Sequence, residues 1–499
     1  MTTSLSTLQS LLPPSEIHHP STPSYRAQSL PWSAHAQAHP KLVITPTSLP
    51  VLSTVVRHLY SSPTLDFAVR NTGTGGASAR DVILSMHGFK DFEFDAASET
   101  AVLGAGLDWS EAEELMAQHA PGWALVGARC GWVGVAGGAL VGGYSWLSHE
   151  FGLISDPQNL LDVQVVLGDG RVVWAGEEDP ELLWGMRGGG GNFGVVVALK
   201  MRARRYVSEI FAGLVFLPYE RLGEVGRWTA EMVRRTGDSR LAFAVTNQGP
   251  GMGVPPQGRR PGIAVMMFDA HGEEHARSKE LGFGELFEMK GLKEVACGMC
   301  PVSGMTKMAD SYRCYQGVNN LWGSAPLVDD VDEGLIERAW DWYEKSLEMA
   351  EGLDQGSTVL FEFMQEVCGP LDFCKKDIVE LKFSQGFFDS SGSHNASAWP
   401  HSGRSHIMQV VLGCDAQKAP AGLEDVVQKR LSQVEAEILG SDKATGRYHA
   451  GFLHEWNDFG LVFGDNLGKL KALKQKYDPQ NRFNKSVDLV GEEKRAKMS

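Results

Sequence analysis

Hydrophobic and polar positions give the first 200 residues a pattern of short strands, helices and glycine-rich joints. Residues 41–60 predict a short strand, a proline-marked turn and the start of a helix. Residues 67–69 predict a strand that runs into a small, glycine-rich loop. Residues 160–175 predict a hairpin, because an Asp-Gly pair separates two apolar runs. Residues 179–197 predict a helix, four consecutive glycines and another strand.

The pattern changes near residue 205. Five later segments are rich in β-branched or aromatic residues and predict strands, at 209–218, 240–248, 261–270, 357–367 and 406–413. Residues 423–439 have helical spacing, with apolar positions at 423, 426, 427, 431, 434 and 438. The segment from about 455 predicts a helix closed by a Tyr-Asp-Pro turn, and residues 247–262 predict a surface loop. The second half therefore predicts an antiparallel sheet with helices on one face.

Composition limits the class of protein. With 499 residues and 43% apolar content, the chain can form two substantial cores. The formal charge of −15, without a basic stripe, argues against a nucleic-acid partner. We expect no membrane segment and a cytoplasmic location, because no apolar run approaches about 18 residues and the N-terminal segment lacks the pattern of a signal peptide. Seven cysteines without a tight framework predict mostly free thiols.

Cys297 and Cys300 form the one C-x2-C pair that suggests a metal site. A structural zinc site needs a second pair of ligands at suitable spacing, and no second C-x2-C pair follows. The sequence therefore predicts no metal site.

Candidate chemistry gathers in residues 126–144, VGARCGWVGVAGGALVGGY, where Cys130 precedes six glycines. Such glycine density lets the backbone approach a flat or phosphorylated ligand. The loop at 70–76, RNTGTGG, follows a predicted strand and would expose successive backbone N–H groups to a pyrophosphate. The alternative for this loop is a plain connection, since it matches neither the P-loop nor the dinucleotide fingerprint.

Four blocks, in this order, carry a family resemblance: RNTGTGG, residues 130–173, residues 179–197 and YDPQNRF near the C-terminus. The chain resembles the berberine bridge enzyme-like flavoproteins of the vanillyl-alcohol oxidase group, which have a PCMH-type FAD-binding domain. The resemblance implies an α+β fold with an FAD-binding domain built from residues 1–205 and 451–499. A substrate-binding domain of antiparallel sheet covered by helices would occupy residues 206–450.

The resemblance also implies an FAD site. Its expected residues are Arg70, Asn71, Thr72, Gly73, Thr74, Gly75, Cys130, Val133, Gly134, Gly137, Gly138, Gly142, His149, Asn159, Val195, Val196, Asn466 and Asn481. Many relatives carry a histidine at the position of Thr74, joined to the flavin; threonine cannot form that bond. Cys130 stands near the position where bicovalent relatives carry a flavin-linked cysteine. A single cysteinyl link and a packed, unreactive thiol both remain open.

Candidate catalytic groups follow from the same resemblance. Relatives often place the base in a late Y-x-N motif, which reads Glu455-Trp456-Asn457 here. Glu455 is the first candidate, Tyr144 the second and Asp458 the third; burial would raise the pKa of a carboxyl group toward neutrality. His401 and His149 are weaker alternatives. Ala136 replaces a family glycine and could obstruct dioxygen, so oxidase and dehydrogenase chemistry both remain open.

The implied function is an FAD-linked oxidoreductase that takes a hydride from a small organic substrate to flavin N5. The missing histidine and the divergent late chain favour secondary-metabolite biosynthesis, with dioxygen as a candidate electron acceptor. Alternatives are a redox-neutral cyclisation or isomerisation, a carbohydrate or alcohol oxidase, and a nonenzymatic flavin-binding protein.

Overall fold

The computed structural model describes residues 2–235, 237–248, 260–363, 396–400 and 406–490. The N-terminal part forms a four-stranded sheet in the order β1-β2-β4-β3, in which β2 and β3 both run parallel to β4. Its elements are α1 (Thr2–Ser10), β1 (Ile17–His18), α2 (Pro23–Ser29), β2 (Leu42–Ile44), α3 (Leu49–Ser61), β3 (Phe67–Arg70) and β4 (Val82–Ser85). The strand-turn-helix and the strand expected between residues 41 and 70 are therefore confirmed.

A second sheet follows in the order β5-β6-β10-β8-β9, with β7 paired to the end of β10. The hairpin expected at 160–175 forms between β8 and β9, and the strand after the four glycines is the long β10. The elements are β5 (Phe92–Asp95), β6 (Thr100–Gly104), α4 (Trp109–His119), β7 (Trp123–Leu125), α5 (Val135–Ala139), α6 (Ser148–Phe151), β8 (Leu160–Val166), β9 (Val172–Trp174), α7 (Ala175–Glu178), α8 (Pro180–Met186) and β10 (Val195–Arg205).

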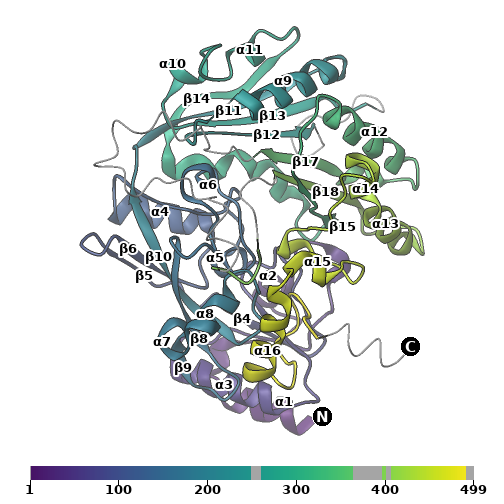
Figure 1. Ribbon diagram of the computed structural model, residues 1–499. Helices are drawn as coiled ribbons and strands as arrows, with labels where there is room; N and C mark the ends of the chain where they lie inside the picture. The colour runs from purple at the N-terminus through teal and green to yellow at the C-terminus, as the bar shows by residue number, and fades with distance from the viewer. Residues whose placement is uncertain (1, 236, 249–259, 364–395, 401–405, 491–499) are drawn as a thin grey trace.

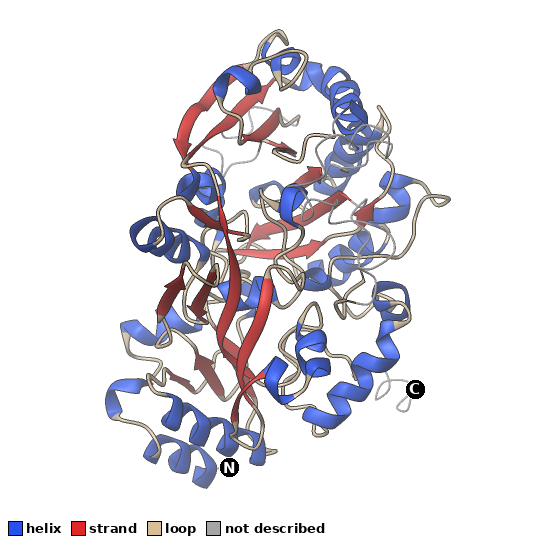
Figure 2. Cartoon of the chain, turned by 60° about the vertical axis from the view of Figure 1, so that its left-hand side comes forward, coloured by secondary structure: helices blue, strands red, loops and turns tan. Residues whose placement is uncertain are grey.

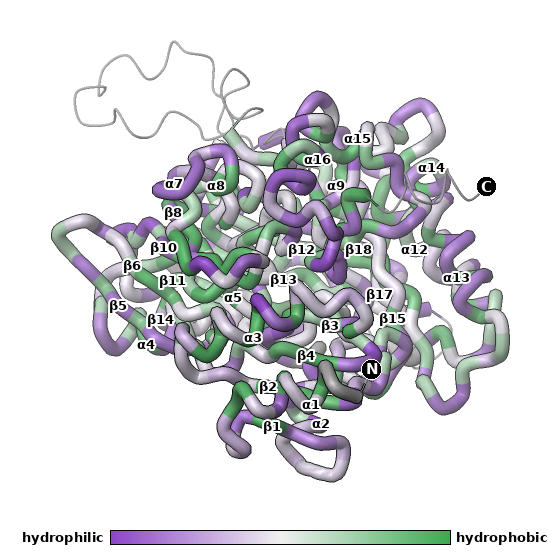
Figure 3. The backbone as a smooth tube through the Cα atoms, turned by 90° about the horizontal axis from the view of Figure 1, so that it is seen from below, coloured by the Kyte–Doolittle hydropathy of each residue, from purple (hydrophilic) through white to green (hydrophobic). Residues whose placement is uncertain are grey.

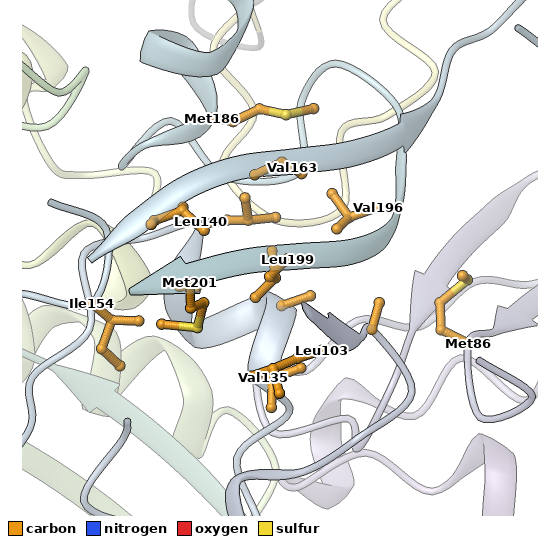
Figure 4. Close-up of a cluster of buried hydrophobic side chains, with 14 of the residues drawn as sticks. Met86, Leu103, Val135, Leu140, Ile154, Val163, Met186, Val196, Leu199 and Met201 are labelled. Carbon is orange, nitrogen blue, oxygen red and sulfur yellow. The ribbon is translucent and has the colours of Figure 1, made fainter. Parts of the chain in front are cut away.

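The short helix α5 packs on this second sheet. Figure 4 shows Leu140, the C-cap of α5, between Val163 of β8 and Leu199 of β10, and Val135, the first residue of α5, beside Leu103 of β6; all five side chains are buried. Full burial of one such side chain contributes about 1.5–3 kcal/mol relative to exposure. This packing anchors the glycine-rich segment expected to bind the cofactor.

The third sheet is antiparallel, in the order β14-β11-β13-β12-β17-β18-β15, with β16 paired to β18. Figure 1 shows it above the first two sheets, and Figure 2 shows helices along its outer side. Its elements are β11 (Glu209–Leu217), α9 (Leu222–Arg235), β12 (Leu241–Asn247), β13 (Ile263–Asp269), α10 (Glu273–Ala276), α11 (Gly284–Phe287), β14 (Lys293–Pro301), β15 (Asn319–Ser324), β16 (Leu327–Val328), α12 (Leu335–Leu347), β17 (Thr358–Phe363), β18 (His406–Asp415), α13 (Leu423–Ser432) and α14 (Val434–Leu439).

The third sheet is covered on both faces. Along β13, Val265 and Met267 pack with the outer helices, whereas Met266 and Phe268 pack with the first half of the chain. Successive side chains of a strand point to opposite faces, so a strand buried on both sides becomes a continuous apolar run. Figure 3 shows hydrophobic segments mainly along such inner strands.

Several expectations need correction or lie outside the described residues. The sequence did not predict β14, whose mostly exposed residues give no clear apolar pattern. The helix expected over 423–439 is interrupted at Gln433, and the helix expected after 455 is two helices, α15 (Phe459–Phe463) and α16 (Asn466–Tyr477), separated at Gly464. The loop core at 249–259 and His401 lie outside the described residues. The domain boundaries at 205 and 450 stay predictions.

The C-terminal helix α16 returns to the first half through a buried ion pair. Lys474 Nζ donates to Asp478 Oδ2 at 2.6 Å, to the Asn192 carbonyl at 2.9 Å and to the Phe483 carbonyl at 2.8 Å. Both charged side chains are at most 1% exposed. Three short bonds compensate the desolvation of the ammonium group. Among the helices of the described residues, none has the length and apolar composition of a membrane span.

We expect Lys474→Met to lower the free energy of unfolding by about 3–5 kcal/mol, because it leaves the Asp478 carboxylate buried without its partner. Chemical denaturation monitored by circular dichroism measures the change. Lys476→Met on the same helix is the matched control, since Lys476 pairs with Asp179 through a side chain that is 60% exposed. An equal loss of free energy of unfolding in both variants would contradict the conclusion that the buried ion pair stabilises the fold more than the exposed one.

Candidate functional site

The fold brings the two predicted glycine-rich segments together. Asn71 Nδ2 donates to the Leu107 carbonyl at 2.7 Å, and the Gly134 N–H donates to Thr72 Oγ1 at 3.2 Å. Thr74 Oγ1 lies 3.0 Å from Thr72 Oγ1 and 3.5 Å from the carbonyl of Trp132. The loop after β3 is therefore fixed against the segment that leads into α5. Thr72 and Gly134 are 62 positions apart in the sequence, so the sequence spacing alone did not predict this contact.

The glycines of these segments serve two different purposes. A methyl group at Gly134 would lie 2.7 Å from Asn71 Nδ2, and one at Gly142 would lie 2.7 Å from the Trp399 ring. The missing side chains at these two positions are thus required by packing within the protein, and their expected place beside the cofactor stays a prediction. By contrast, a methyl group at Gly75 or Gly137 would meet no atom within 4 Å, and both residues are exposed.

Gly138 and Val133 form the side of this segment next to α4. A methyl group at Gly138 would lie 3.3 Å from Val133 Cγ1 and 3.7 Å from Trp109 Nε1. Trp109 is buried, and its indole N–H has no hydrogen-bond partner among the described residues. Because Gly138 has no side chain, the buried indole N–H of Trp109 is not covered by a methyl group at this position.

Arg70 organises the loop from behind. Its guanidinium donates to the carbonyls of Gln28, Leu30 at 2.6 Å and Thr72 at 3.1 Å, and its side chain is buried. Burial lowers the pKa of Arg70 to about 10. Gly73, at φ +80°, lies against this guanidinium, where any Cβ would be 2.5 Å from Nε. Arg70 and Gly73 thus shape the loop, and their expected contact with the cofactor stays a prediction.

Cys130 and Tyr144 lie deep in the molecule but retain some accessible surface. Burial, followed by the charge of Glu362, raises the pKa of Cys130 to about 12 and raises the pKa of Tyr144 even further. Both groups therefore stay protonated at neutral pH. A protonated phenol is a hydrogen-bond donor and a poor base, so the structure argues against Tyr144 as the proton acceptor.

A buried ion pair next to Cys130 and Tyr144 was not found from the sequence. Arg129 Nη1 lies 3.3 Å from Glu362 Oε1, and the two side chains are 6% and 8% exposed. The guanidinium also stacks 4.6 Å above the centroid of Trp146. Its three nitrogens make no well-formed hydrogen bond among the residues that the structure describes. A buried guanidinium with unused donors is costly unless a further group binds them.

Strand geometry explains where Glu362 points. Its neighbours Phe361 and Phe363 on β17 pack with the outer helices. Alternation along a strand therefore places Glu362 on the opposite face, toward the first half of the chain. In the sequence, the one signal for this position is that Glu362 is the single polar residue in the run VLFEF. A charged residue in a strand buried on both faces indicates a functional position.

His149 joins the same junction, but as a structural group. Its Nε2 is 2.8 Å from the Phe363 carbonyl, and its side chain is buried. Burial, with a contribution from Arg129, lowers the pKa of His149 to about 3, so the imidazole is neutral. Since a carbonyl only accepts, Nε2 carries the proton and donates it there. His149 thus connects α6 to β17 through Nε2, and its expected contact with the cofactor stays a prediction.

Three predicted asparagines also hold protein segments. Asn159 Nδ2 donates to the carbonyls of Phe151 and Leu153, both at 2.7 Å, and its Oδ1 accepts from Arg204 at 3.0 Å. Asn466 Nδ2 donates to the Ser397 and Ala398 carbonyls at 3.1 and 3.3 Å, and Asn481 Nδ2 donates to Asp488 at 3.0 Å. The Nδ2 groups of Asn159, Asn466 and Asn481 thus donate to the protein, whereas the buried Oδ1 of Asn481 has no partner among the described residues. Asn481 takes the turn role, at φ +50°.

Val195 and Val196 are buried in β10, where they pair with Val166 and Val165 of β8. The register shifts between Val196 and Ala198, so the ladder is irregular at this point. Irregular ladders leave backbone groups outside the regular pairing. The expected backbone contact at these valines stays a prediction.

The two carboxylate candidates of the late chain lie at the surface. Glu455 is exposed in the turn before α15. Asp458 is also exposed, and its Oδ1 accepts from the Gly460 N–H at 2.7 Å as the N-cap of α15. Neither residue meets the burial that the hypothesis required, which corrects both assignments.

His449, rather than Glu455, brings the late chain into the site. Its ring lies 5.6 Å from that of Tyr144 and 5.0 Å from that of Trp399, and its side chain is 6% exposed. His449 Nδ1 accepts from the Gly451 N–H at 3.1 Å, which leaves Nε2 as the protonated nitrogen of the neutral ring. His449 was not predicted from the sequence, because a lone histidine between loops carries no motif.

Comparison with known proteins identifies an FAD binding domain family at residues 40–176 and a berberine and berberine-like family at residues 449–487. An uncharacterized FAD-linked oxidoreductase of Arthroderma benhamiae is 30% identical over 48% of each chain. The match thus spans about half the length of that relative. FAD-linked oxidoreductase pgmH of Aspergillus terreus is 24% identical over 85% of this chain and 83% of its own.

Solved structures agree on the fold. A variant of berberine bridge enzyme in complex with (S)-reticuline superposes with a TM-score of 0.75 at 14% identity, covering 97% of this chain and 98% of the other. This likeness confirms the α+β fold expected from the sequence: an FAD-binding domain from both chain ends, with an inserted antiparallel sheet covered by helices. The cofactor of the domain is FAD.

The residues of the site fit this cofactor. Gly75 and Gly137 leave open space beside two adjoining backbone segments, and the buried Arg129 guanidinium offers unused donors beside Cys130 and Tyr144. Open backbone suits a phosphorylated ligand, and a guanidinium suits a carbonyl-rich ring or an anion. The loop at 70–76 and the segment at 131–138 would therefore hold FAD.

We expect Gly137→Ala to weaken FAD binding at least about tenfold while the apoprotein is as stable as before or more stable, because alanine favours a helix by about 1 kcal/mol over glycine. Fluorescence titration of the apoprotein with FAD and thermal unfolding measure the two effects. Gly468→Ala in α16 is the matched control, since Gly468 is also exposed with open space beside it. Unchanged FAD affinity in Gly137→Ala would refute the assignment.

Proposed function

Because the chain belongs to the berberine bridge enzyme-like FAD-linked oxidoreductases, we propose that it oxidises a small organic molecule by removing a hydride and a proton. When bound, FAD supplies the hydride acceptor of this chemistry. The observation that carries the proposal is the buried Arg129–Glu362 pair, at 3.3 Å, beside Tyr144 and Cys130. It lies where the third sheet meets the FAD-binding half.

Glu362 is the proposed proton acceptor. Its carboxylate faces the FAD-binding half from β17 and is shielded from solvent, so a substrate hydroxyl or amine N–H could donate to it without competition from water. Arg129 Nη1 lies 3.3 Å from this carboxylate, so the two opposite charges compensate each other inside the protein. Two-electron oxidation then balances: the hydride leaves the substrate carbon, and the proton goes to Glu362.

Tyr144 and Arg129 are proposed to orient the substrate. The pKa of Tyr144 is raised by burial and by Glu362, so the phenol remains protonated and donates a hydrogen bond. The unused N–H groups of Arg129 would bind a carbonyl or carboxylate oxygen. A substrate with one oxidisable C–H next to a hydroxyl or amine, and one oxygen acceptor, matches this arrangement.

A role in secondary-metabolite biosynthesis is part of the proposal. Its support is the threonine at 74 in place of the histidine of many relatives, and the similarity to berberine bridge enzyme, which was solved with the small molecule (S)-reticuline. A cytoplasmic location and dioxygen as the final electron acceptor belong to the same proposal.

We expect Glu362→Gln to slow anaerobic reduction of the flavin by about 100-fold or more, because a general base contributes about 10²–10⁴-fold. Stopped-flow absorbance with a substrate found by screening measures the rate, and the FAD content of the variant should be unchanged. Glu455→Gln is the control and should react like the wild type, because Glu455 is exposed. Slow flavin reduction in Glu455→Gln together with a normal rate in Glu362→Gln would instead assign Glu455 as the base.

The same anaerobic experiment separates the two classes of reaction. Bleaching of the flavin on addition of substrate supports hydride transfer. Product formation with the flavin still oxidised would support a redox-neutral cyclisation or isomerisation and overturn the proposal.

We expect the FAD to be held without a covalent bond. Threonine replaces the linking histidine at position 74, and burial raises the pKa of Cys130 to about 12, so little thiolate exists to attack the flavin. Acid precipitation of the purified protein should release the yellow colour to the supernatant. Colour retained in the pellet, and lost from it in Cys130→Ala, would establish a cysteinyl link.

A further inference from the structure

A cluster of two histidines and one aspartate lies at the end of the third sheet, away from the site described above. Asp238 belongs to the loop between α9 and β12, His271 follows β13, and His275 is in the short helix α10, which Figure 1 shows at the edge of the sheet. One ligand atom from each of the three residues lies within 4.8 Å of the other two. Three segments of the chain thus converge on one point.

The distances suit a tetrahedral metal ion. His271 Nε2 is 3.0 Å from Asp238 Oδ2, and His275 Nε2 is 3.7 Å from the same oxygen. In a tetrahedral zinc site with bonds of about 2.0–2.2 Å, ligand atoms lie about 3.3–3.6 Å apart. The observed separations bracket this range, so small side-chain rotations would complete the geometry.

The orientation of His275 is the second, independent observation. Its Nδ1 lies 2.8 Å from Oδ2 of Asp269, a carboxylate with no exposed surface. The carboxylate accepts, so Nδ1 donates, and Nε2 faces Oδ2 of Asp238 at 3.7 Å. Nε2 therefore points toward a carboxylate oxygen across a gap in which a cation bound to both atoms would be favourable.

Asp269 therefore occupies the position of a supporting residue for a metal ligand. Ligating histidines almost always donate their other ring nitrogen to a carboxylate or carbonyl, which fixes the ring. The Asp269 carboxylate also accepts from the backbone N–H of His271 at 2.8 Å, so it supports both histidines. The carboxylates of Asp238 and Asp269 bring two formal negative charges to the cluster, which a divalent ion would neutralise.

We propose that Asp238, His271 and His275 bind a first-row divalent metal ion such as Zn²⁺. Water completes the coordination, since the three side chains are 19–35% exposed. Nitrogen and carboxylate ligands of this kind favour zinc and its neighbours over magnesium or calcium. The prediction of no metal site rested only on ligands that follow the cysteine pair. The H-x3-H pair at 271 and 275 precedes Cys297.

The ion would strengthen the junction between the two halves of the molecule. It would fix the loop at 238, two residues before Arg240, to the turn after β13. Arg240 Nε lies 3.5 Å from Glu150 Oε1 in α6, and Tyr206 donates to the same carboxylate at 3.0 Å. The predicted effect of the metal is therefore on stability, with no part in the redox step.

Isothermal titration of the chelator-treated holoprotein with ZnCl₂ tests the proposal, with MgCl₂ as the comparison. We expect one Zn²⁺ per chain, a higher unfolding temperature with zinc, and no binding of magnesium. His275→Gln should abolish the binding, since its amide can still donate to Asp269 but offers a poor metal ligand. Asp269→Asn should weaken the binding by about 10–100-fold.

His119→Gln, a substitution of a histidine outside the cluster, is the matched control and should bind zinc like the wild type. Intact FAD absorbance shows that each variant is folded. Stoichiometric binding that survives His275→Gln would place the ion elsewhere and overturn the proposal. Absence of one-to-one binding at pH 7.5, in protein with normal FAD content, would show that the cluster is a protonated histidine–aspartate network and would equally overturn it.

Discussion

The ion pair between Arg129 and Glu362 is the interaction on which the arrangement of the site depends. The cation comes from the FAD-binding half and the anion from β17 of the third sheet, so each half buries a charge that only the other can compensate. Removing either partner would leave the other charge buried without compensation, at a cost of about 3–5 kcal/mol. The pair therefore sets how Tyr144, Cys130 and the glycine-rich backbone face the sheet.

Glycine content marked the right region, but the individual glycines have different physical causes. Gly134 and Gly142 are needed because Asn71 and Trp399 occupy the space of a side chain. Gly137, three positions after Gly134, faces open space. Some glycines of a cofactor-binding loop are thus required by packing within the protein, and others by the space that the ligand needs. A glycine-rich motif in the sequence does not distinguish the two kinds.

Burial also decided the roles of the titratable groups. The carboxylates chosen from the late chain, Glu455 and Asp458, proved to be exposed, whereas Glu362 and His449 are buried beside Tyr144. Burial makes Cys130 and Tyr144 harder to ionise, which assigns them to packing and hydrogen bonding rather than to proton abstraction. The order of the family motifs locates the cofactor, but the proposed reacting group comes from the inserted sheet.

Local patterns in the chain predicted many of the strands, among them β11, β12 and β13, and a smaller share of the helices, because hydrophobic periodicity and glycine-rich turns are properties of neighbouring residues. The two-part architecture and the FAD-binding segments were implied by the family resemblance. Which side chains meet was decided by the folded arrangement. Glu362 lies 233 positions after Arg129, and Asp238 lies 33 before His271. Such pairs depend on strand register and sheet order, which place Glu362 between two outward-facing phenylalanines and therefore on the inner face. Local patterns carry no information about that registration between distant strands.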